Sequence, residues 1–335
     1  MEKENKPVIG VIGSGSWATA LIKILTENDC KVKWWVRKEQ DVTHILKYRH
    51  NPDYLRAVEI HLDKVAPDSD ITNIVKASDW ILLVVPAAFA KEALEKLPKD
   101  AFKDKKVISA IKGMIPNENL LISDFVEKYY GVKPEDTAVI AGPCHAEEVA
   151  MEKQSYLTVA SENYNFANEL GDMLSSHFIK VHSVEDLYGV EYSAIIKNII
   201  AIACGVAHGL NYGDNFQAVL VSNALQEIER FVNTISPKEN RSISATAYLG
   251  DLLVTTYSQF SRNRTFGNMI GRGYSVKSAQ LEMEMIAEGY YATKCIFDIN
   301  KKLGLSLPII EAVYHIVYNK ISPLIEFKLL KDNLK

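Results

Sequence analysis

Lys197 and Asn198 stand inside "SAIIKNIIAIACG", an apolar run of helical composition over residues 193–205. No charged residue lies within one helical turn of the lysine. Moving an ammonium out of water costs several kcal/mol unless it is compensated, and such costs persist mainly at working sites. Lys197 is therefore either a snorkelling lysine whose ammonium reaches the surface, or an acid/base group that has a partner elsewhere in the chain.

A second polar group follows in "GDLLVTTYSQFSRNRTFG". Asp251 and Thr255 are spaced i, i+4 and can share one helical face, and Arg262 and Asn263 come after a polar linker. A carboxylate can orient an ammonium, and an arginine offers paired donors to a phosphate. The alternative is a capped helix followed by a cluster of surface arginines.

Near the N-terminus, "GVIGSGSWATAL" has Gly13, Gly15 and Ala18 in the G-x-G-x-x-G/A spacing, between a strand pattern and a helix pattern. This context is the one that the dinucleotide fingerprint requires, with the helix N-terminus facing a pyrophosphate. A glycine-rich turn without a ligand is the alternative. The pattern favours an NAD or NADP cofactor.

The adenosine ribose of NAD is usually bound by an acidic residue at the end of the second strand. Here that strand ends in "WWVRKEQ", so that Arg37 and Lys38 stand at this place. They could accept the 2′-phosphate of NADP, or they could be solvated charges. Glu39 beside them leaves the choice between NAD and NADP open.

The elements that must position these groups alternate between strands and helices up to about residue 185, and later segments are helix-like. We expect an N-terminal Rossmann-like, doubly wound α/β domain with a mostly parallel sheet, followed by an all-α C-terminal domain. The domains are expected over 1–188, which binds the dinucleotide, and 189–335, which is helical and binds the substrate.

Lys112 and Gly142 each follow a strand, at the edge where such sheets bind ligands. Strands are expected at 8–13, 31–36, 80–85, 106–111, 137–141, 156–160 and 178–182, helices at 71–77, 88–96 and 117–129, a polar stretch at 38–70, and a frayed tail at 327–335.

Composition narrows the class of protein. Of the 335 residues 47% are hydrophobic and 24% charged, with a formal net charge of -4, so that no basic excess indicates nucleic acid. We expect a cytoplasmic protein, because the N-terminus lacks a secretory pattern, and no membrane span, because the apolar runs are short or interrupted. The four cysteines and eight histidines have no ligand spacing, so no metal is expected.

Taken together, "GSGSWATAL", "IKGM", "AGPCHAEEV", "IIKNIIAIACG", "GDLLVTTYSQFSRNRTFG" and "MEMIAEG" resemble the NAD(P)-dependent sn-glycerol-3-phosphate dehydrogenases of the bacterial type. The resemblance runs in order from about residue 8 to 310. It implies reversible reduction of dihydroxyacetone phosphate to sn-glycerol 3-phosphate, the backbone for phospholipid synthesis.

The resemblance also implies roles for individual residues. Lys197 would be the general acid/base, and Asp251 and Lys112 would complete the catalytic group. Asn198 and Thr255 are further polar partners for substrate oxygens. The cofactor-binding residues would be Gly13, Gly15, Ser16, Trp17, Arg37, Lys112, Ala146, Arg262, Ile286 and Glu288, and the substrate-binding residues Lys112, Gly142, Cys144, Lys197, Asn198, Asp251, Thr255, Ser261, Arg262 and Asn263.

Three positions depart from the family pattern. Ala18 replaces the commoner third glycine, Cys144 stands where Ser or Thr is usual, and Ala87 stands where the family often has Ser. A thiol is a weaker donor than a hydroxyl, and Ala87 puts a cofactor-side hydrogen bond in doubt.

Two other functions are compatible with these patterns. A 3-hydroxyacid dehydrogenase also combines a Rossmann domain with a lysine on a helix, but its substrate anion is a carboxylate. A non-catalytic nucleotide sensor would need the glycine turn but not the polar set around Lys197. For assembly we expect a homodimer, because helical domains often supply oligomer interfaces.

Overall fold

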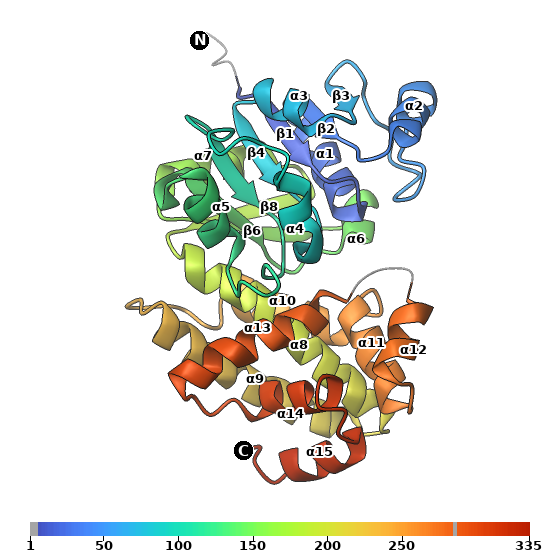
Figure 1. Cartoon of the computed structure of the whole chain (residues 1–335), viewed down its shortest axis with the longest axis vertical. Coiled ribbons are helices and arrows are strands. Elements are labelled where there is room, and N and C mark those ends of the chain that lie inside the picture. The colour runs from blue at the N-terminus through green and yellow to red at the C-terminus, as the bar shows by residue number, and fades with distance from the viewer. Residues whose placement is uncertain (1–5, 284–286) are drawn as a thin grey trace. The chain divides into compact units, whose positions relative to one another are not determined.

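The computed structural model describes residues 6–283 and 287–335 (Figure 1). The chain divides into two compact units. The sheet unit comprises the residues up to Val85, Phe89–Ile111 and Ile122–Leu187, and the helical unit comprises Pro86–Ala88, Lys112–Leu121 and Tyr188–Lys335. Two short segments before residue 188 thus pack with the helical unit.

Eight strands form a single sheet in the sheet unit, in the order β3-β2-β1-β4-β5-β6-β7-β8. Every neighbouring pair is parallel except β6 and β7, which are antiparallel. The expected Rossmann-like, mostly parallel sheet is confirmed. The strands are β1 Ile9–Ile12, β2 Val32–Trp35, β3 Val65–Asp68, β4 Trp80–Leu83, β5 Lys106–Ser109, β6 Thr137–Ala141, β7 Ser155–Ser161 and β8 Ile179–Val184.

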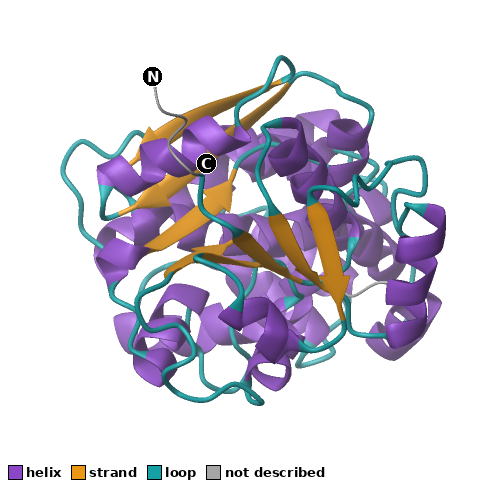
Figure 2. Ribbon diagram, turned by 90° about the horizontal axis from the view of Figure 1, so that it is seen from above, coloured by secondary structure: helices purple, strands orange, loops and turns teal. Residues whose placement is uncertain are grey.

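Helices lie on both sides of the strands, as Figure 2 shows. Because β1, β4 and β6 are buried along their whole length, their sequences are continuous apolar runs rather than alternating ones. The chain leaves β1 toward β2 and returns to β4, so the carboxyl ends of β1 and β4 form the switch point where such sheets bind ligands. The helices are α1 Ser16–Glu27, α2 Glu39–Tyr48, α3 Ile71–Lys76, α4 Ala87–Leu94, α5 Ile122–Tyr130, α6 Ala146–Ala150, α7 Tyr164–Leu174 and the 3₁₀ turn η1 Pro134–Asp136.

The sequence analysis missed two elements in the stretch 38–70, namely α2 and β3. β3 contains Pro67 and lies at the edge of the sheet, where it pairs only with β2. Its residues therefore lack a strand-like apolar pattern. The helix expected over 117–129 begins only at Ile122, because Asn117 and Asn119 have positive φ angles of 67° and 55°. Left-handed residues cannot continue a right-handed helix.

The helical unit is built around α8, Leu187–Gly209. By length and composition α8 is the one helix in the described part of the chain that could cross a membrane, and its most apolar stretch is wholly buried, as in the core helix of a globular unit. The other helices are α9 Asp214–Ile235, α10 Asp251–Tyr257, α11 Arg262–Gly271, α12 Val276–Glu282, α13 Glu288–Leu303, α14 Pro308–Val317, α15 Pro323–Leu330 and the π turn η2 Thr246–Gly250.

Helices α8 and α11 cross with their backbones in contact. A Cβ atom at Gly205 would lie 2.1 Å from the carbonyl oxygen of Arg264, and one at Gly267 would lie 2.1 Å from that of Ile202. No side chain fits at either position, so glycine is required there by close approach. This crossing fixes the first turns of α11 beside the C-terminal half of α8.

The C-terminal segment corrects the sequence analysis, which expected a frayed tail over 327–335. α15 includes Phe327, which is fully buried and packs near Tyr212 and Phe216. The last residue, Lys335, is also held, because its N–H donates to Asn223 Oδ1 at 3.0 Å. Phe327 and Leu330 of this segment therefore belong to the core of the helical unit, whereas Leu329 is exposed.

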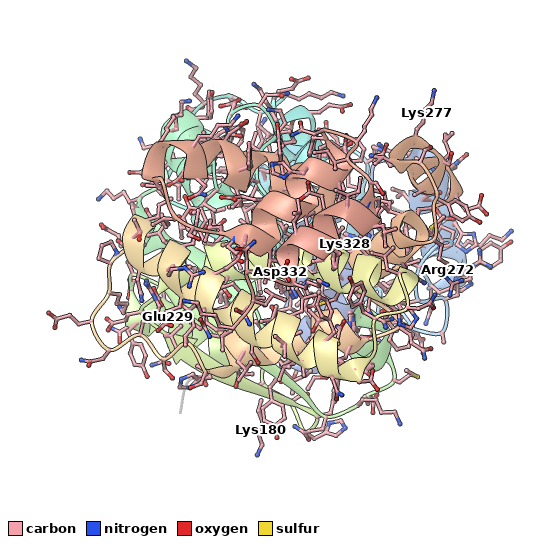
Figure 3. The ribbon with its side chains drawn as sticks, turned by 90° about the horizontal axis from the view of Figure 1, so that it is seen from below. Lys180, Glu229, Arg272, Lys277, Lys328 and Asp332 are labelled. Atoms are coloured by element: carbon pink, nitrogen blue, oxygen red, sulfur yellow. The ribbon has the colours of Figure 1, made fainter. Side chains whose placement is uncertain are left out.

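Charged side chains of both signs cover the outer helices and strands. Figure 3 labels six exposed ones, and among them Lys180 and Lys277 project away from the ribbon. The labelled residues are Lys180, Glu229, Arg272, Lys277, Lys328 and Asp332.

Candidate active site

The glycine turn connects β1 to α1 at the switch point of the sheet. Gly13 has φ 134°, and a Cβ there would lie 2.7 Å from the carbonyl oxygen of Val84, so the fold itself requires this glycine. Gly15 is different, because among the described residues, its two chain neighbours aside, no heavy atom lies within 4 Å of the place its Cβ would take. The space beside Gly15 is open to a ligand, which fits the close approach of a pyrophosphate.

α1 starts at Ser16, with Gly15 as the residue before its first turn. No side chain caps this N-terminus. The N–H groups of its first turn and its positive dipole end are suited to an anion, and Ser16 and Trp17 are the first two residues of the helix. Ala18 is completely buried, as expected for the position where α1 packs on the sheet.

Arg37 and Lys38 follow β2 and are exposed. Glu39 is the first residue of α2, and its carboxylate accepts a hydrogen bond from the hydroxyl of Ser69. A basic residue and an acidic residue thus both stand at the end of β2. This arrangement leaves both NAD and NADP compatible with the site.

Gly142 and Cys144 lie just beyond the carboxyl end of β6. Gly142 has φ 119°, and a Cβ there would lie 2.7 Å from the carbonyl oxygen of Tyr156. The Cys144 thiol donates to that same oxygen at 3.2 Å. Ala146, which begins α6, is nearly buried.

The helical unit contains a group of three charged side chains, of which Lys197 and Asp251 are buried and Lys112 is partly exposed. Lys197 Nζ is in direct contact with Asp251 Oδ1, and Lys112 Nζ lies 3.9 Å from Asp251 Oδ2. Lys197 is 3% exposed and Asp251 1% exposed. The snorkelling alternative for Lys197 is therefore wrong, because its ammonium lies inside the protein beside a carboxylate.

Burial lowers the pKa of Lys197 to about 7. The nearby Lys112 also lowers this pKa, whereas the Asp251 carboxylate raises it. A lysine poised near neutral pH can both donate and accept a proton, which is what a general acid/base must do.

Asp251 owes its place to local backbone geometry. The π turn η2 ends at Gly250, and α10 begins at Asp251. Single π turns inside or beside helices are frequent at functional sites. One turn later, Thr255 is buried and its hydroxyl donates to the Asp251 carbonyl oxygen at 2.7 Å, so the two side chains lie on one face of α10.

Asn198 joins α8 to the segment that carries Lys112. Its Nδ2 donates to the Lys112 carbonyl oxygen at 2.9 Å. The amide is 5% exposed. Asn198 therefore holds the backbone of Lys112 beside the helix that carries Lys197.

The first residues of α11 form a further polar group. The Ser261 hydroxyl caps the helix by accepting from the Arg264 N–H at 3.3 Å, and Arg262 is exposed. Asn263 is 8% exposed, and its Oδ1 accepts from the Gly289 N–H at 2.9 Å. These contacts orient the N-terminus of α11.

Glu288 has a partner that sequence reasoning missed. Its Oε1 accepts from the Ala87 N–H at 3.1 Å, and burial raises its pKa, an effect that Arg262 opposes. Gly113 lies at the same place, because a Cβ there would be 2.7 Å from that of Ala87 and 3.5 Å from Glu288 Oε2. The contact joins residues 201 positions apart, so no local pattern indicates it.

The expected residues thus gather in two groups, one in each unit. Ile286 lies outside the described residues. The sheet unit holds Gly13, Gly15, Ser16, Trp17, Arg37, Gly142, Cys144 and Ala146, and the helical unit holds Lys112, Lys197, Asn198, Asp251, Thr255, Ser261, Arg262, Asn263 and Glu288.

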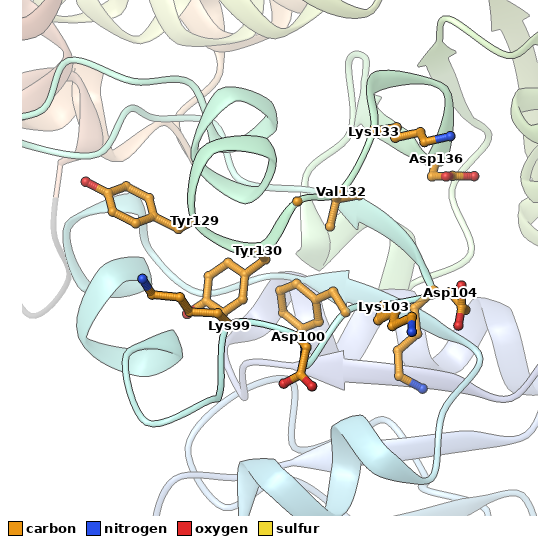
Figure 4. Close-up of a pocket in the computed structure, with 12 residues that line it drawn as sticks. Lys99, Asp100, Lys103, Asp104, Tyr129, Tyr130, Val132, Lys133 and Asp136 are labelled. Atoms are coloured by element: carbon orange, nitrogen blue, oxygen red, sulfur yellow. The ribbon is translucent and has the colours of Figure 1, made fainter.

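Two surface cavities lie away from these residues. One of about 520 Å³ is lined by residues that precede β5 and β6, among them Lys103, Tyr130 and Lys133 (Figure 4). It therefore lies near the amino ends of those strands, at the edge opposite to the glycine turn. A second of about 340 Å³ in the helical unit is lined by Tyr290, Tyr291 and Lys294 among others.

No group of three or more His, Cys, Asp or Glu residues is arranged to hold a metal ion within residues 6–283 and 287–335. All four cysteines are buried, and none of them forms a disulfide.

A parallel sheet with this strand order and an unblocked glycine turn at its switch point is typical of the dinucleotide-binding domain of NAD(P)-dependent dehydrogenases. The helical unit has a buried lysine of lowered pKa beside a carboxylate, which is a kind of group that can act as acid/base in hydride transfer to a carbonyl. Fold and site together define a two-unit dehydrogenase.

Comparison with known proteins gives the particular family. The family described as "NAD-dependent glycerol-3-phosphate dehydrogenase" matches with its N-terminal part over residues 8–167 and with its C-terminal part over 186–327. The chain belongs to this family.

Individual relatives agree over nearly the whole chain. The chain is 34% identical to glycerol-3-phosphate dehydrogenase of Syntrophomonas wolfei, over 93% of this chain and 91% of that protein, and 33% identical to that of Bacillus subtilis, over 93% and 90%. Both relatives are named as acting with NAD(P)+. Among solved structures, glycerol-3-phosphate dehydrogenase of Coxiella burnetii superposes with a TM-score of 0.90 at 29% identity, covering 97% of this chain and 98% of that one.

Proposed function

We propose that this protein catalyses the reversible, NAD(P)H-dependent reduction of dihydroxyacetone phosphate to sn-glycerol 3-phosphate. The observation that carries the proposal is the buried contact of Lys197 with Asp251, with Lys112 at 3.9 Å from the same carboxylate. A sensor that only binds a nucleotide has no use for this costly charged group. Residues 1–188 would supply most of the dinucleotide site and residues 189–335 most of the substrate site, and each part would add a few residues to the other site.

When bound, the nicotinamide supplies the hydride for reduction of the C2 carbonyl or accepts it in the reverse direction. In this chain Gly13, Gly15, Ser16 and Trp17 would hold the pyrophosphate end. Arg37 would lie at the adenosine end, and Lys112, Ala146, Arg262 and Glu288 would complete the binding site. Ile286 is proposed for it from the family pattern alone.

Lys197 would donate the proton in reduction. As the C2 carbonyl of dihydroxyacetone phosphate gains a hydride, its oxygen takes up negative charge, and the ammonium stabilises that charge and then protonates the oxygen. Lys197 becomes a neutral amine and regains its proton from water. In the oxidation of glycerol 3-phosphate the neutral amine accepts the hydroxyl proton. Asp251 would orient Lys197 in both directions.

Arg262 and Asn263 would bind the substrate phosphate at the N-terminus of α11, with Ser261 beside them. A guanidinium offers two parallel donors to phosphate oxygens, and the helix N-terminus adds its dipole. Arg262 is exposed. An exposed arginine side chain can reach over a phosphate once the ligands are bound.

The remaining substrate contacts are proposed for Gly142, Cys144, Asn198, Thr255 and Lys112. The Cys144 thiol and the Thr255 hydroxyl already donate within the protein, to Tyr156 and Asp251. Toward a substrate hydroxyl they would therefore serve as acceptors, a weak one in the case of sulfur.

We further propose that the product supplies the glycerol phosphate backbone for phospholipid synthesis, that the protein works in the cytoplasm, and that it forms a homodimer. Sedimentation of the purified protein tests the dimer directly. A monomer at all accessible concentrations would contradict it.

The experiment that tests the function compares wild type, Lys197→Ala and Lys277→Ala. Lys277 is exposed on α12 and is the matched control (Figure 3). The measurement is the loss of NADH or NADPH absorbance after addition of dihydroxyacetone phosphate, with folding checked by circular dichroism. We expect wild type and Lys277→Ala to turn over alike and Lys197→Ala to lose at least about 100-fold in kcat/KM, as for removal of a general acid.

The same assay separates the alternatives. Cofactor binding by wild type without turnover of dihydroxyacetone phosphate would contradict the proposed substrate. Oxidation of a 3-hydroxyacid would then indicate the carboxylate-binding class. Binding without turnover of either substrate would indicate a sensor.

A further inference from the structure

The carbonyl groups of the glycine turn are held by buried side chains from two distant parts of the sheet unit. Trp34 of β2 donates its indole Nε1–H to the Gly13 carbonyl oxygen at 2.8 Å. Asn51 donates from Nδ2 to the Ser14 carbonyl oxygen at 3.0 Å. Trp34 is 0% exposed and Asn51 2% exposed. Two consecutive carbonyls of the turn therefore have fixed partners away from solvent.

Asn51 is itself held from both ends. Its Nδ2 also donates to the Thr19 hydroxyl at 2.9 Å, and its Oδ1 accepts from the N–H groups of Asp53 at 3.0 Å and Tyr54 at 3.1 Å. An amide with two donors and two acceptor positions is saturated by these four bonds. Asn51 thus cannot rotate without losing several of them.

The next carbonyl is held in the same way. The Gly15 carbonyl oxygen accepts from both the backbone N–H and the hydroxyl of Thr19, each at 3.1 Å. That hydroxyl is also the group that Asn51 contacts. Asn51, Thr19 and Trp34 thus fix the carbonyls of three successive residues.

A peptide unit is planar and trans, so its N–H points opposite to its carbonyl. Fixing the carbonyls of Gly13, Ser14 and Gly15 therefore turns the N–H groups of Ser14, Gly15 and Ser16 the other way. Within the described residues none of these three N–H groups makes a hydrogen bond. They form a set of oriented donors beside the open space at Gly15.

We propose that Trp34 and Asn51 are positioning residues for the cofactor pyrophosphate. By binding the carbonyls they hold the turn in the conformation that presents its N–H groups, so that the turn pays no reorganisation free energy on binding the dinucleotide. The inference rests on the NAD(P) cofactor of the family. It concerns residues that do not belong to the glycine pattern itself.

The adjacent tryptophan offers a matched control. Trp35 also donates its indole N–H to a backbone carbonyl, that of Ser69 at 2.9 Å, and Ser69 lies outside the turn. Trp34→Phe and Trp35→Phe each remove one indole donor and retain an aromatic ring. Only the first frees a carbonyl of the glycine turn.

The experiment measures the Kd of NADH and of ADP-ribose by titration calorimetry for wild type, Trp34→Phe, Trp35→Phe and Asn51→Ala. ADP-ribose keeps the pyrophosphate but lacks the nicotinamide. We expect Trp34→Phe to weaken both ligands by about 5- to 10-fold, as for the loss of one orienting hydrogen bond, and Asn51→Ala by at least as much. Trp35→Phe should bind within about twofold of wild type.

Steady-state kinetics provide a second reading. For Trp34→Phe the KM for NADH should rise, whereas kcat and the KM for dihydroxyacetone phosphate at saturating NADH should stay at wild-type values. A residue that only supports folding would lower the melting temperature without this split.

Unchanged Kd values in folded Trp34→Phe and Asn51→Ala would overturn the proposal, as would an equal loss in Trp35→Phe. Asn51→Ala keeps the test valid if Trp34→Phe does not fold. If wild type binds neither NADH nor ADP-ribose, both this inference and the proposed function are overturned. If wild type binds both ligands and the variants bind them equally well, only this inference is overturned.

Discussion

Two of the ionisable groups that the helical unit buries lie in very different surroundings, Lys197 on α8 and Glu227 on α9. Lys197 contacts the carboxylate of Asp251. Glu227 accepts hydrogen bonds from the N–H groups of Ile309 at 2.7 Å and Ile310 at 3.3 Å, in the first turn of α14. Each is almost completely inaccessible to solvent.

Burial shifts the pKa of both groups toward neutrality. It lowers the pKa of Lys197 to about 7 and raises that of Glu227 to about 8. A perturbed pKa alone would mark both as functional candidates. Their partners tell them apart, because Lys197 lies among charged side chains, whereas Glu227 caps the first turn of a helix and is satisfied by backbone groups.

The largest effect that this comparison predicts is on catalysis. Asp251→Ala should lower kcat/KM for dihydroxyacetone phosphate by about 100-fold or more, since Lys197 loses the carboxylate that orients it and keeps it charged. The measurement is NADH oxidation by protein shown to be folded. An activity within a few-fold of wild type would mean that Lys197 works without its partner.

Glu227→Ala should lower stability rather than activity. It leaves two buried N–H groups of α14 without an acceptor, so we expect the free energy of unfolding to fall by about 2–4 kcal/mol. Activity per folded molecule should stay within about twofold of wild type, because among the described residues Glu227 makes its hydrogen bonds with Ile309 and Ile310 and with no proposed site residue. Chemical denaturation gives the first quantity and the NADH assay the second. A large loss of activity in folded Glu227→Ala would mean that Glu227 belongs to the active site. The distinction between Lys197 and Glu227 would then be wrong.

The pH dependence of catalysis sharpens the role of Lys197. Reduction needs its protonated form, so kcat/KM for dihydroxyacetone phosphate should fall about tenfold per pH unit above the pKa of about 7. Oxidation of glycerol 3-phosphate needs the neutral amine and should rise with pH up to that value. In Asp251→Asn the fall of kcat/KM for reduction should begin at lower pH, because the Asp251 carboxylate raises the pKa of Lys197. A fall that begins at the same pH in both proteins would mean that another group causes it.

The smallest effect concerns stability. The folded protein holds a proton on Glu227 up to a pKa of about 8, whereas the unfolded chain releases it near 4.5. The folded state therefore binds more protons between these values, and the contribution of Glu227 to stability is greatest below pH 4.5 and is lost as pH rises toward 8. In Glu227→Gln this slope should vanish from denaturation curves collected across the range. An unchanged slope would show that Glu227 does not cause it.

The sequence predicted the parts that rest on short-range patterns. The alternation of apolar strands and helices gave the sheet, and the glycine spacing gave the turn, because both depend on residues close together in the chain. Lys197 was recognised because an ammonium in an apolar run violates a strong physical preference. Its partner Asp251, 54 residues away, could also be predicted, because a buried charge needs an opposite charge beside it.

Other features depend on contacts that no local pattern encodes. The bond from Ala87 to Glu288 and the attachment of residues 112–121 to the helical unit exist only once the chain has folded. Asn51 lay in a stretch interpreted as polar connection, although all its hydrogen-bonding groups are used. A single buried asparagine leaves no periodic signal. The end of the chain was misjudged for a similar reason, since Phe327 finds its aromatic partners on α9 and just before it.

The crossing of α8 and α11 has a consequence for which substrates can be selected. With backbone against backbone at Gly205 and Gly267, the two helices cannot move closer, and moving apart would leave a gap that no side chain fills. The distance from Lys197 to the first turn of α11 is therefore fixed within the helical unit. If α11 binds the substrate phosphate as proposed, we expect the site to accept one length of carbon chain between carbonyl and phosphate, and we expect this selection to be insensitive to surface mutation.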